Sequence, residues 1–271
     1  MPELPEVETT RRGIEPSMIG QIIQNVIIRH HGLRWPIPDD LPQRLTGSTI
    51  RAIKRRAKYL LIDLGHGGVL IHLGMSGSLR ILAKSTPPKK HDHLDIEFSP
   101  DLALRLHDPR RFGAVLWQPG RVEDHPLLTN LGPEPLEADF DAAYLHAALS
   151  KRQIAIKPAI MDNHIVVGVG NIYASESLFR AGIHPETQAN QVSQAHCKKL
   201  VSAIKATLQD ALKAGGSTLR DFVNSDGTSG YFQLQTYVYD RAGQGCKICG
   251  SEIRQIRQGQ RSTFYCTGCQ H

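Results

Sequence analysis

The chain opens on the stretch Met1-Pro2-Glu3-Leu4-Pro5-Glu6-Val7-Glu8, around which the rest of the sequence is organised. Removal of Met1 would make Pro2 the N-terminus, with a free secondary amine that titrates at about pH 7.7–8.0. Such an amine can attack an aldehyde-level carbon to form an iminium, and the adjacent Glu3 carboxyl is a suitable proton shuttle. The same residues are also typical of an ordinary helix start, where prolines and acidic side chains are favoured.

Periodicity predicts one helix followed by many short strands. Apolar and polar residues keep helical spacing over about residues 3–15, and Pro16 is expected to end that helix. Because strands without intervening helices favour a β-sandwich, we expect one here. The strands are expected at residues 21–28, 48–64, 68–72, 78–82, 94–98, 102–107 and 114–118.

The character of the sequence changes at Gly132-Pro133-Glu134-Pro135, which we interpret as a domain boundary. Beyond it we expect helices at residues 139–150 (capped by Asp139), 158–163, 171–181 and 191–214. The predicted fold is a multidomain α+β protein. Its domains are an N-terminal β-sandwich with a leading helix (1–132), a helical domain (133–236) and a C-terminal metal-binding hairpin (237–271).

Four of the five cysteines cluster at the C-terminus as two Cys-x-x-Cys pairs separated by sixteen residues, Cys246, Cys249, Cys266 and Cys269. This spacing predicts a structural zinc site with four thiolate ligands. Two disulfides are the alternative, which the unpaired Cys197 and the absence of a signal peptide disfavour. Basic side chains dominate the span between the pairs, which suits a nucleic-acid-binding arm: Lys247, Arg254, Arg257 and Arg261 against Glu252.

The overall charge also favours an anionic partner. Lys and Arg (32) outnumber Asp and Glu (26), for a formal net charge of +6 at pH 7 and a pI near 9.1. No uninterrupted apolar stretch is long enough for a membrane span, so we expect a cytoplasmic protein with reduced cysteines and no membrane partner.

Residues 51–58 contain five basic side chains and no acidic one: Arg51, Lys54, Arg55, Arg56 and Lys58. The residues leave open whether this is a solvated strand face or a phosphate-binding surface. Strand alternation would place Lys58 on a different face from Arg55, and so turn one lysine toward the site.

Three glycine-containing segments are further candidates for nucleic-acid contact. Met75 and Phe112 lie in turns, where they either fold back into the core or form a wedge between base steps. Gly168-Val169-Gly170-Asn171 opens a helix, whose free N–H groups suit a phosphate, although an ordinary tight turn explains the glycines as well.

Several separated strings resemble the formamidopyrimidine-DNA glycosylases, which repair oxidised purines. The likeness extends from Met1 to Gln270. Its strings include residues 2–9, 55–60, 161–176 (similar to that family's helix-two-turn-helix element) and 260–264 (similar to its zinc-finger sequence).

The resemblance implies a bifunctional glycosylase and abasic-site lyase that works through a Pro2 Schiff base with β,δ-elimination. It implies one structural Zn²⁺, no other cofactor, a monomeric bacterial protein, and duplex DNA with an oxidised purine as partner. The implied catalytic residues are Pro2, Glu3, Lys58 and Arg261, and the implied DNA contacts are His91, Arg110, Asn171, Gln153, Met75 and Phe112.

Gln153 departs from the family's pattern, which often has a basic residue there; Lys151 or Arg152 would have to substitute for it.

Two other functions remain open. The endonuclease VIII proteins share the architecture but remove oxidised pyrimidines, usually with Gly where this chain has Leu4. A non-catalytic zinc-finger DNA-binding protein would not need a free Pro2 amine.

Overall fold

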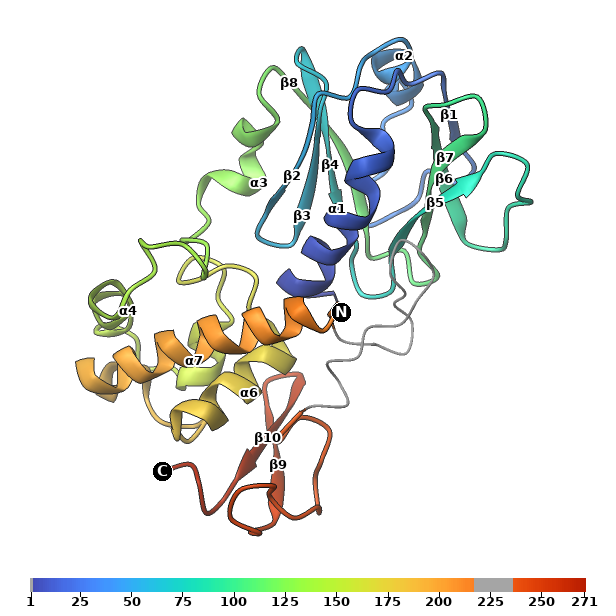
Figure 1. The fold of residues 1–271 in the computed structure, drawn as a ribbon. Coiled ribbons are helices and arrows are strands. Elements are labelled where there is room, and N and C mark those ends of the chain that lie inside the picture. The colour runs from blue at the N-terminus through green and yellow to red at the C-terminus, as the bar shows by residue number, and fades with distance from the viewer. Residues whose placement is uncertain (1, 217–235) are drawn as a thin grey trace. The chain divides into compact units, whose positions relative to one another are not determined.

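The computed structural model describes residues 2–216 and 236–271, which divide into two compact units (Figure 1). Unit 1 holds residues 2–129 with 214–216, and unit 2 holds residues 130–213 with 236–271. Met1 and residues 217–235, whose composition predicts a loop, lie outside the described residues. Within the described ranges, no helix combines the length and apolar character that crossing a bilayer requires.

Unit 1 contains the predicted sandwich of two four-stranded antiparallel sheets. The first has the order β1 (Asn25–Ile28), β6 (Asp92–Glu97), β7 (Leu102–His107) and β5 (Ser78–Ala83). The second has the order β2 (Ala52–Arg56), β3 (Tyr59–Asp63), β4 (Gly67–His72) and β8 (Ala114–Pro119). Side chains of both sheets, such as Leu104 and Val69, form one buried core. Shorter helical elements are α2 (Leu41–Leu45), η1 (Val122–Asp124) and α3 (Pro126–Thr129).

Helix α1 (Leu4–Met18) contacts β2 and β5, which are edge strands of the two sheets. The prediction that Pro16 ends this helix is wrong, because Pro16 lies inside its last turn. A proline there removes a single backbone hydrogen bond. Full burial of Ile14 and Met18 offsets that loss, since burying one such side chain stabilises the fold by about 1.5–3 kcal/mol.

Two predicted strands are wrong in extent. The segment 48–64 is a hairpin, because Ala57 adopts a left-handed φ of 54° and reverses the chain between β2 and β3. The segment 21–28 forms a strand only from Asn25. Ile22 makes a single isolated bridge to Thr49 and is 55% exposed, so its apolar character does not report burial.

Unit 2 contains the helices and the C-terminal hairpin. Its helices are α4 (Ala142–Leu149), α5 (Ile156–Ile160), α6 (Asn171–Ala181), η2 (Ala189–Gln191) and α7 (Gln194–Lys213), and its strands are β9 (Ile253–Gln258) and β10 (Arg261–Cys266). Helix α6 has the predicted bounds and packs against α7 and β10. The predicted cap of α4 is wrong. Asp141 caps this helix by accepting a hydrogen bond from Tyr144 N at 2.7 Å, two residues beyond Asp139.

Candidate functional site

The two residues predicted to do the chemistry lie immediately before α1. Pro2 is buried, and Glu3 is the N-cap residue with only 2% of its surface exposed. The Glu3 N–H donates to Glu6 Oε2 at 2.8 Å, within a capping box that fixes the direction of the chain before the helix. The backbone at Pro2 is therefore oriented by the start of α1.

Lys58 lies in the β2–β3 turn and not in a strand, so the alternation argument for its direction is wrong. Arg55 connects this turn to α1: its Nε donates to Glu8 Oε2 at 3.2 Å and its Nη1 donates to the Ala57 carbonyl at 3.1 Å. Lys58 is 8% exposed. Sequence reasoning missed Glu8 as the partner of Arg55, because 47 residues separate them.

The basic run is partly neutralised within unit 1. Lys54 donates to Glu123 at 2.6 Å, and Arg55 pairs with Glu8. Because these acids come from distant parts of the chain, the run contributes less free positive charge than its sequence indicates.

Met75, Arg110 and Phe112 line one groove of about 730 Å³, together with Arg34 and His72. Met75 is 37% exposed and Phe112 is 45% exposed, so the interpretation that they fold back into the core is wrong. The Arg110 guanidinium carbon lies 5.2 Å from the centre of the Phe112 ring, which is within cation–π range. The groove thus presents two apolar side chains and a cation at one opening.

Asp108, which sequence reasoning missed, holds the two loops of this groove together. Its carboxylate is fully buried and accepts from the Ser76 hydroxyl and the Gly113 N–H, each at 2.8 Å. The Ser76 Oγ in turn accepts from the Arg110 N–H at 3.1 Å. Gly74 has a φ of 65°, and a Cβ there would lie 2.4 Å from the Phe112 carbonyl carbon. Only glycine permits this approach.

His72 borders the same groove in its neutral form. Burial, followed by the charges of Lys58 and Arg34, lowers the pKa of His72 to about 4. Its Nδ1 accepts from the Gly74 N–H at 3.0 Å, which fixes the tautomer with hydrogen on Nε2. No pattern in the sequence assigned a role to His72.

His91 precedes β6 with a left-handed φ of 74°. Its carbonyl accepts from the Asp108 N–H at 3.0 Å, so the Asp108 segment positions His91 as well as Arg110. The His91 ring lies 6.1 Å from that of His93 and 6.2 Å from that of His107.

In unit 2, the side chain of Asn171 at the start of α6 points to the β9–β10 hairpin. Its Nδ2 donates to the Ser262 carbonyl at 3.0 Å, beside Arg261. Its Oδ1 accepts from Lys157 Nζ at 2.5 Å, and the same ammonium donates to Thr263 Oγ1 at 2.7 Å. The structure therefore places the Asn171 amide against the backbone of the residue after Arg261, with the buried Lys157 as an organiser that the sequence did not reveal.

Gln153 is exposed in the segment before α5. Of its two suggested substitutes, Arg152 pairs with Asp162 at 3.0 Å, and Lys151 is exposed.

Glu176, also missed, anchors the segment that leads into the cysteine-rich hairpin. Its carboxylate is 1% exposed and accepts backbone N–H groups from Tyr237, Val238 and Tyr239 at 2.8–2.9 Å. Burial raises the pKa of Glu176, while these three donors oppose the shift. The only sequence signal was an acid on an otherwise buried helix face.

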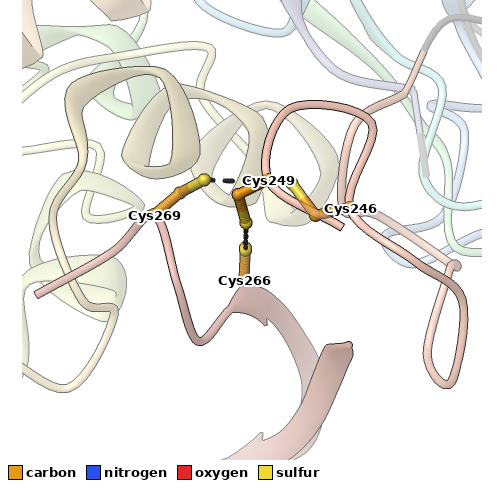
Figure 2. A group of neighbouring side chains, drawn as sticks. All are labelled: Cys246, Cys249, Cys266 and Cys269. Atoms are coloured by element: carbon orange, nitrogen blue, oxygen red, sulfur yellow. Dashed lines mark hydrogen bonds between the residues drawn. The ribbon is translucent and has the colours of Figure 1, made fainter. Parts of the chain in front are cut away.

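The four predicted cysteine ligands converge, with all Sγ atoms within 4.8 Å of one another (Figure 2). The Sγ atoms of Cys246 and Cys269 are 3.9 Å apart, and those of Cys249 and Cys266 are 3.4 Å apart. A tetrahedral site with Zn–S bonds of about 2.3 Å needs sulfurs about 3.8 Å apart, so the geometry fits zinc. Burial and the neighbouring thiols raise the pKa of Cys266, whereas hydrogen bonds to Ser251 lower the pKa of Cys249 to about 6.

Comparisons with known proteins agree with this architecture. Three family models match: the formamidopyrimidine-DNA glycosylase N-terminal domain over residues 1–115, the formamidopyrimidine-DNA glycosylase H2TH domain over 131–223, and a zinc finger found in FPG and IleRS over 243–271. The formamidopyrimidine-DNA glycosylases of Cupriavidus pinatubonensis and Thioalkalivibrio sulfidiphilus are 55% and 56% identical, with both chains of each pair fully covered.

Solved structures of Lactococcus lactis Fpg are similar over nearly the whole chain. Its complex with Fapy-dG-containing DNA has a TM-score of 0.91 at 36% identity, covering 99% of this chain and 100% of that one. Its complex with abasic-site DNA has a TM-score of 0.91 at 36% identity, covering 99% of each chain.

A β-sandwich with a leading helix, a helix-two-turn-helix domain and a four-cysteine zinc finger define a DNA repair glycosylase. The chain belongs to the formamidopyrimidine-DNA glycosylase family. It is a glycosylase and abasic-site lyase for oxidised purines with one structural zinc, so the alternative of a non-catalytic zinc-finger protein is wrong.

Proposed function

We propose that Pro2, once Met1 is removed, is the nucleophile that excises the oxidised purine. The Pro2 nitrogen attacks C1′ of the damaged nucleotide, the bond from C1′ to the base breaks, and the base leaves with a proton. Glu3 protonates the sugar ring oxygen as the ring opens, and the product is an iminium between Pro2 and C1′.

The same iminium supports strand cleavage. Its positive charge acidifies C2′, whose proton is lost as the 3′ phosphate leaves, and a second elimination then releases the 5′ phosphate. Lys58 and Arg261 stabilise the negative charge that develops on the leaving phosphates. The position of Lys58 in a turn that Arg55 ties to α1 supports its part in this step.

The single observation that carries the nucleophile assignment is the first turn of α1. A nearly buried Glu3 stands next to Pro2, and the capping box with Glu6 fixes the backbone of both. A free amine at this place would be a rigid nucleophile beside its own proton donor.

Borohydride reduction of the iminium tests the assignment. Protein with a mature Pro2 terminus should become covalently attached to 8-oxoguanine duplex, whereas protein extended by an N-terminal tag should bind without attachment. Full attachment of the tagged protein would show that another group is the nucleophile. The same reaction on duplexes that carry an oxidised pyrimidine distinguishes a purine-directed activity from that of the endonuclease VIII proteins.

We further propose that the exposed groove of unit 1 inserts into the duplex. The target base must leave the stack before C1′ can be reached, and apolar wedges such as Met75 and Phe112 can fill the space that it leaves. Arg110 then contacts the orphaned partner base. His91, Asn171 and Gln153 hold the DNA backbone, and Lys151 supplies the positive charge that Gln153 lacks. The enzyme acts as a monomer in the bacterial cytoplasm.

A further inference from the structure

Unit 2 has a second groove that the proposed chemistry does not use. It holds about 540 Å³ at the C-terminal end of α6 and includes Phe179, Arg180, Lys199, Tyr237 and Ile248 in its lining. Five segments of the chain build it: the end of α6, the face of α7, Tyr237, the turn between the first zinc-binding cysteines, and Cys269.

The floor of this groove is apolar. The rings of Phe179 and Tyr237 stack at 5.3 Å with an interplanar angle of 22°, and both belong to the small core of the zinc finger. Ile248, in the turn between Cys246 and Cys249, is 68% exposed, more than any other large hydrophobic side chain among the described residues. An exposed apolar side chain above a partly open aromatic floor is typical of a surface that binds a partner.

The rim of the groove is cationic. The Arg180 guanidinium carbon lies 5.9 Å and Lys247 Nζ 5.6 Å from the centre of the Tyr237 ring. An adjoining hollow of about 450 Å³ adds Lys198 to Arg180 and Lys199. Asp210 pairs with Arg180 at 2.7 Å, but among the described residues no carboxylate lies within ion-pair distance of the three lysines.

This groove is separate from the DNA-contacting residues of the same unit. Arg180 lies nine residues after Asn171 in α6, about 13 Å along the helix axis at 1.5 Å per residue. In the hairpin, Arg261 begins β10, whereas Cys269, the zinc ligand that lines the groove, follows the other end of that strand. A ligand in the groove therefore leaves Asn171 and Arg261 accessible.

We propose that this groove is a docking site for an acidic peptide segment of a partner protein, anchored by one bulky apolar side chain. The apolar side chain packs between Ile248 and the Phe179–Tyr237 stack, and flanking carboxylates pair with Lys198, Lys199 and Lys247. A concave pocket with an aromatic floor suits a single protruding side chain better than the regular phosphate ridge of a duplex. The enzyme would thereby bind its partner while engaged on DNA.

Fluorescence anisotropy with the zinc-loaded full-length protein tests the proposal. The probe is a fluorescein-labelled peptide, Glu-Asp-Glu-Phe-Asp-Glu, and the control peptide has Ser in place of Phe. We expect saturable binding of the probe and at least tenfold weaker binding of the control. Lys199→Glu and Ile248→Ser should each lower the affinity for the probe tenfold or more. Lys213→Glu, a charge reversal at an exposed position near the end of α7, should not change its affinity.

Zinc content and 8-oxoguanine cleavage should be unchanged in all three variants, which excludes misfolding as the cause. Binding should persist when the protein is saturated with a duplex that carries an abasic-site analogue. Three results would overturn the proposal: no saturable binding, equal affinity for the Ser peptide, or displacement of the probe by that duplex or by oligothymidylate. The last would identify the groove as a nucleic-acid surface. Borohydride attachment through Pro2 is measured separately, so its failure would not affect this test.

Discussion

The Nζ of Lys157 lies 2.5 Å from Oδ1 of Asn171, and this contact connects a buried lysine to the first residue of α6. Lys157 is 1% exposed and also donates to Thr263 of β10. One ammonium therefore links α5, α6 and the zinc-finger hairpin. The Lys157 ammonium also sets the orientation of the Asn171 amide, whose Nδ2 donates to the carbonyl of Ser262, the residue after Arg261.

Replacing Lys157 with Met should lower the free energy of unfolding by about 3 kcal/mol, because it leaves the acceptors of the half-buried Asn171 and the buried Thr263 without their donor. We also expect at least tenfold weaker binding of abasic-analogue DNA, since Asn171 loses its fixed orientation. Urea unfolding and gel-shift titration measure the two effects. Lys213→Met, at an exposed position of α7, is the matched control. Unchanged stability and affinity in the Lys157 variant would contradict the organising role.

Glu176→Gln should destabilise unit 2 by about 2–3 kcal/mol. The glutamine oxygen can replace one carboxylate oxygen, but its NH₂ group would face a backbone N–H of the Tyr237–Tyr239 segment. Thermal unfolding monitored by circular dichroism measures the change, with the exposed Glu186→Gln as control. If the two variants have the same midpoint of thermal unfolding, Glu176 is not the anchor of that segment.

Cys266→Ser should abolish zinc binding and unfold the C-terminal hairpin, because metal binding and folding are linked in four-cysteine sites. Metal analysis should give about one zinc per parent chain and none in the variant, with DNA affinity lost because Arg261 is no longer held. Cys197→Ser, which changes a buried cysteine outside the cluster, should retain its zinc. Well-folded parent protein without zinc would refute the metal assignment.

Arg110→Ala should remove most of the preference for cytosine over adenine opposite the lesion. The guanidinium has only donors, and the pairing edge of cytosine offers acceptors where adenine presents an amine. A good bidentate contact discriminates by about 1–3 kcal/mol. Single-turnover cleavage of 8-oxoguanine opposite each base measures the ratio, and cleavage of abasic DNA should persist. If the variant keeps the parental preference, a residue other than Arg110 recognises the unpaired base.

The low pKa of His72 predicts a loss of stability in acid. Because its pKa is about 4 in the fold and 6.5 in the unfolded chain, the unfolded state binds more protons between those values. The His72 contribution is therefore intact above pH 6.5. It falls as the pH drops toward 4, by up to about 3 kcal/mol.

His72→Asn keeps an acceptor for the Gly74 N–H without a titrating ring. Urea unfolding at pH 7.5 and pH 5 should show a smaller acid loss in this variant than in the parent. An equal loss in both proteins would mean that other groups cause the acid sensitivity.

The sequence by itself determined the features that depend on neighbours along the chain. The bounds of α6 follow from its glycine-rich start and local periodicity, and the two Cys-x-x-Cys pairs predict a metal site through their short spacing. The Pro2-Glu3 terminus was also recognisable from local sequence, which placed Met75 and Phe112 in turns but left their exposure open.

Only the tertiary structure decided which distant groups meet. Pro16 stays helical because Ile14 and Met18 reach a core built from both sheets. The turn that holds Lys58 is connected through Arg55 to Glu8 on α1. The contact of Lys157 with Thr263 spans 106 residues, and that of Glu176 with Val238 spans 62. No local pattern encodes such pairs, because a buried charge is stable only where the complete fold brings its partners within hydrogen-bonding distance.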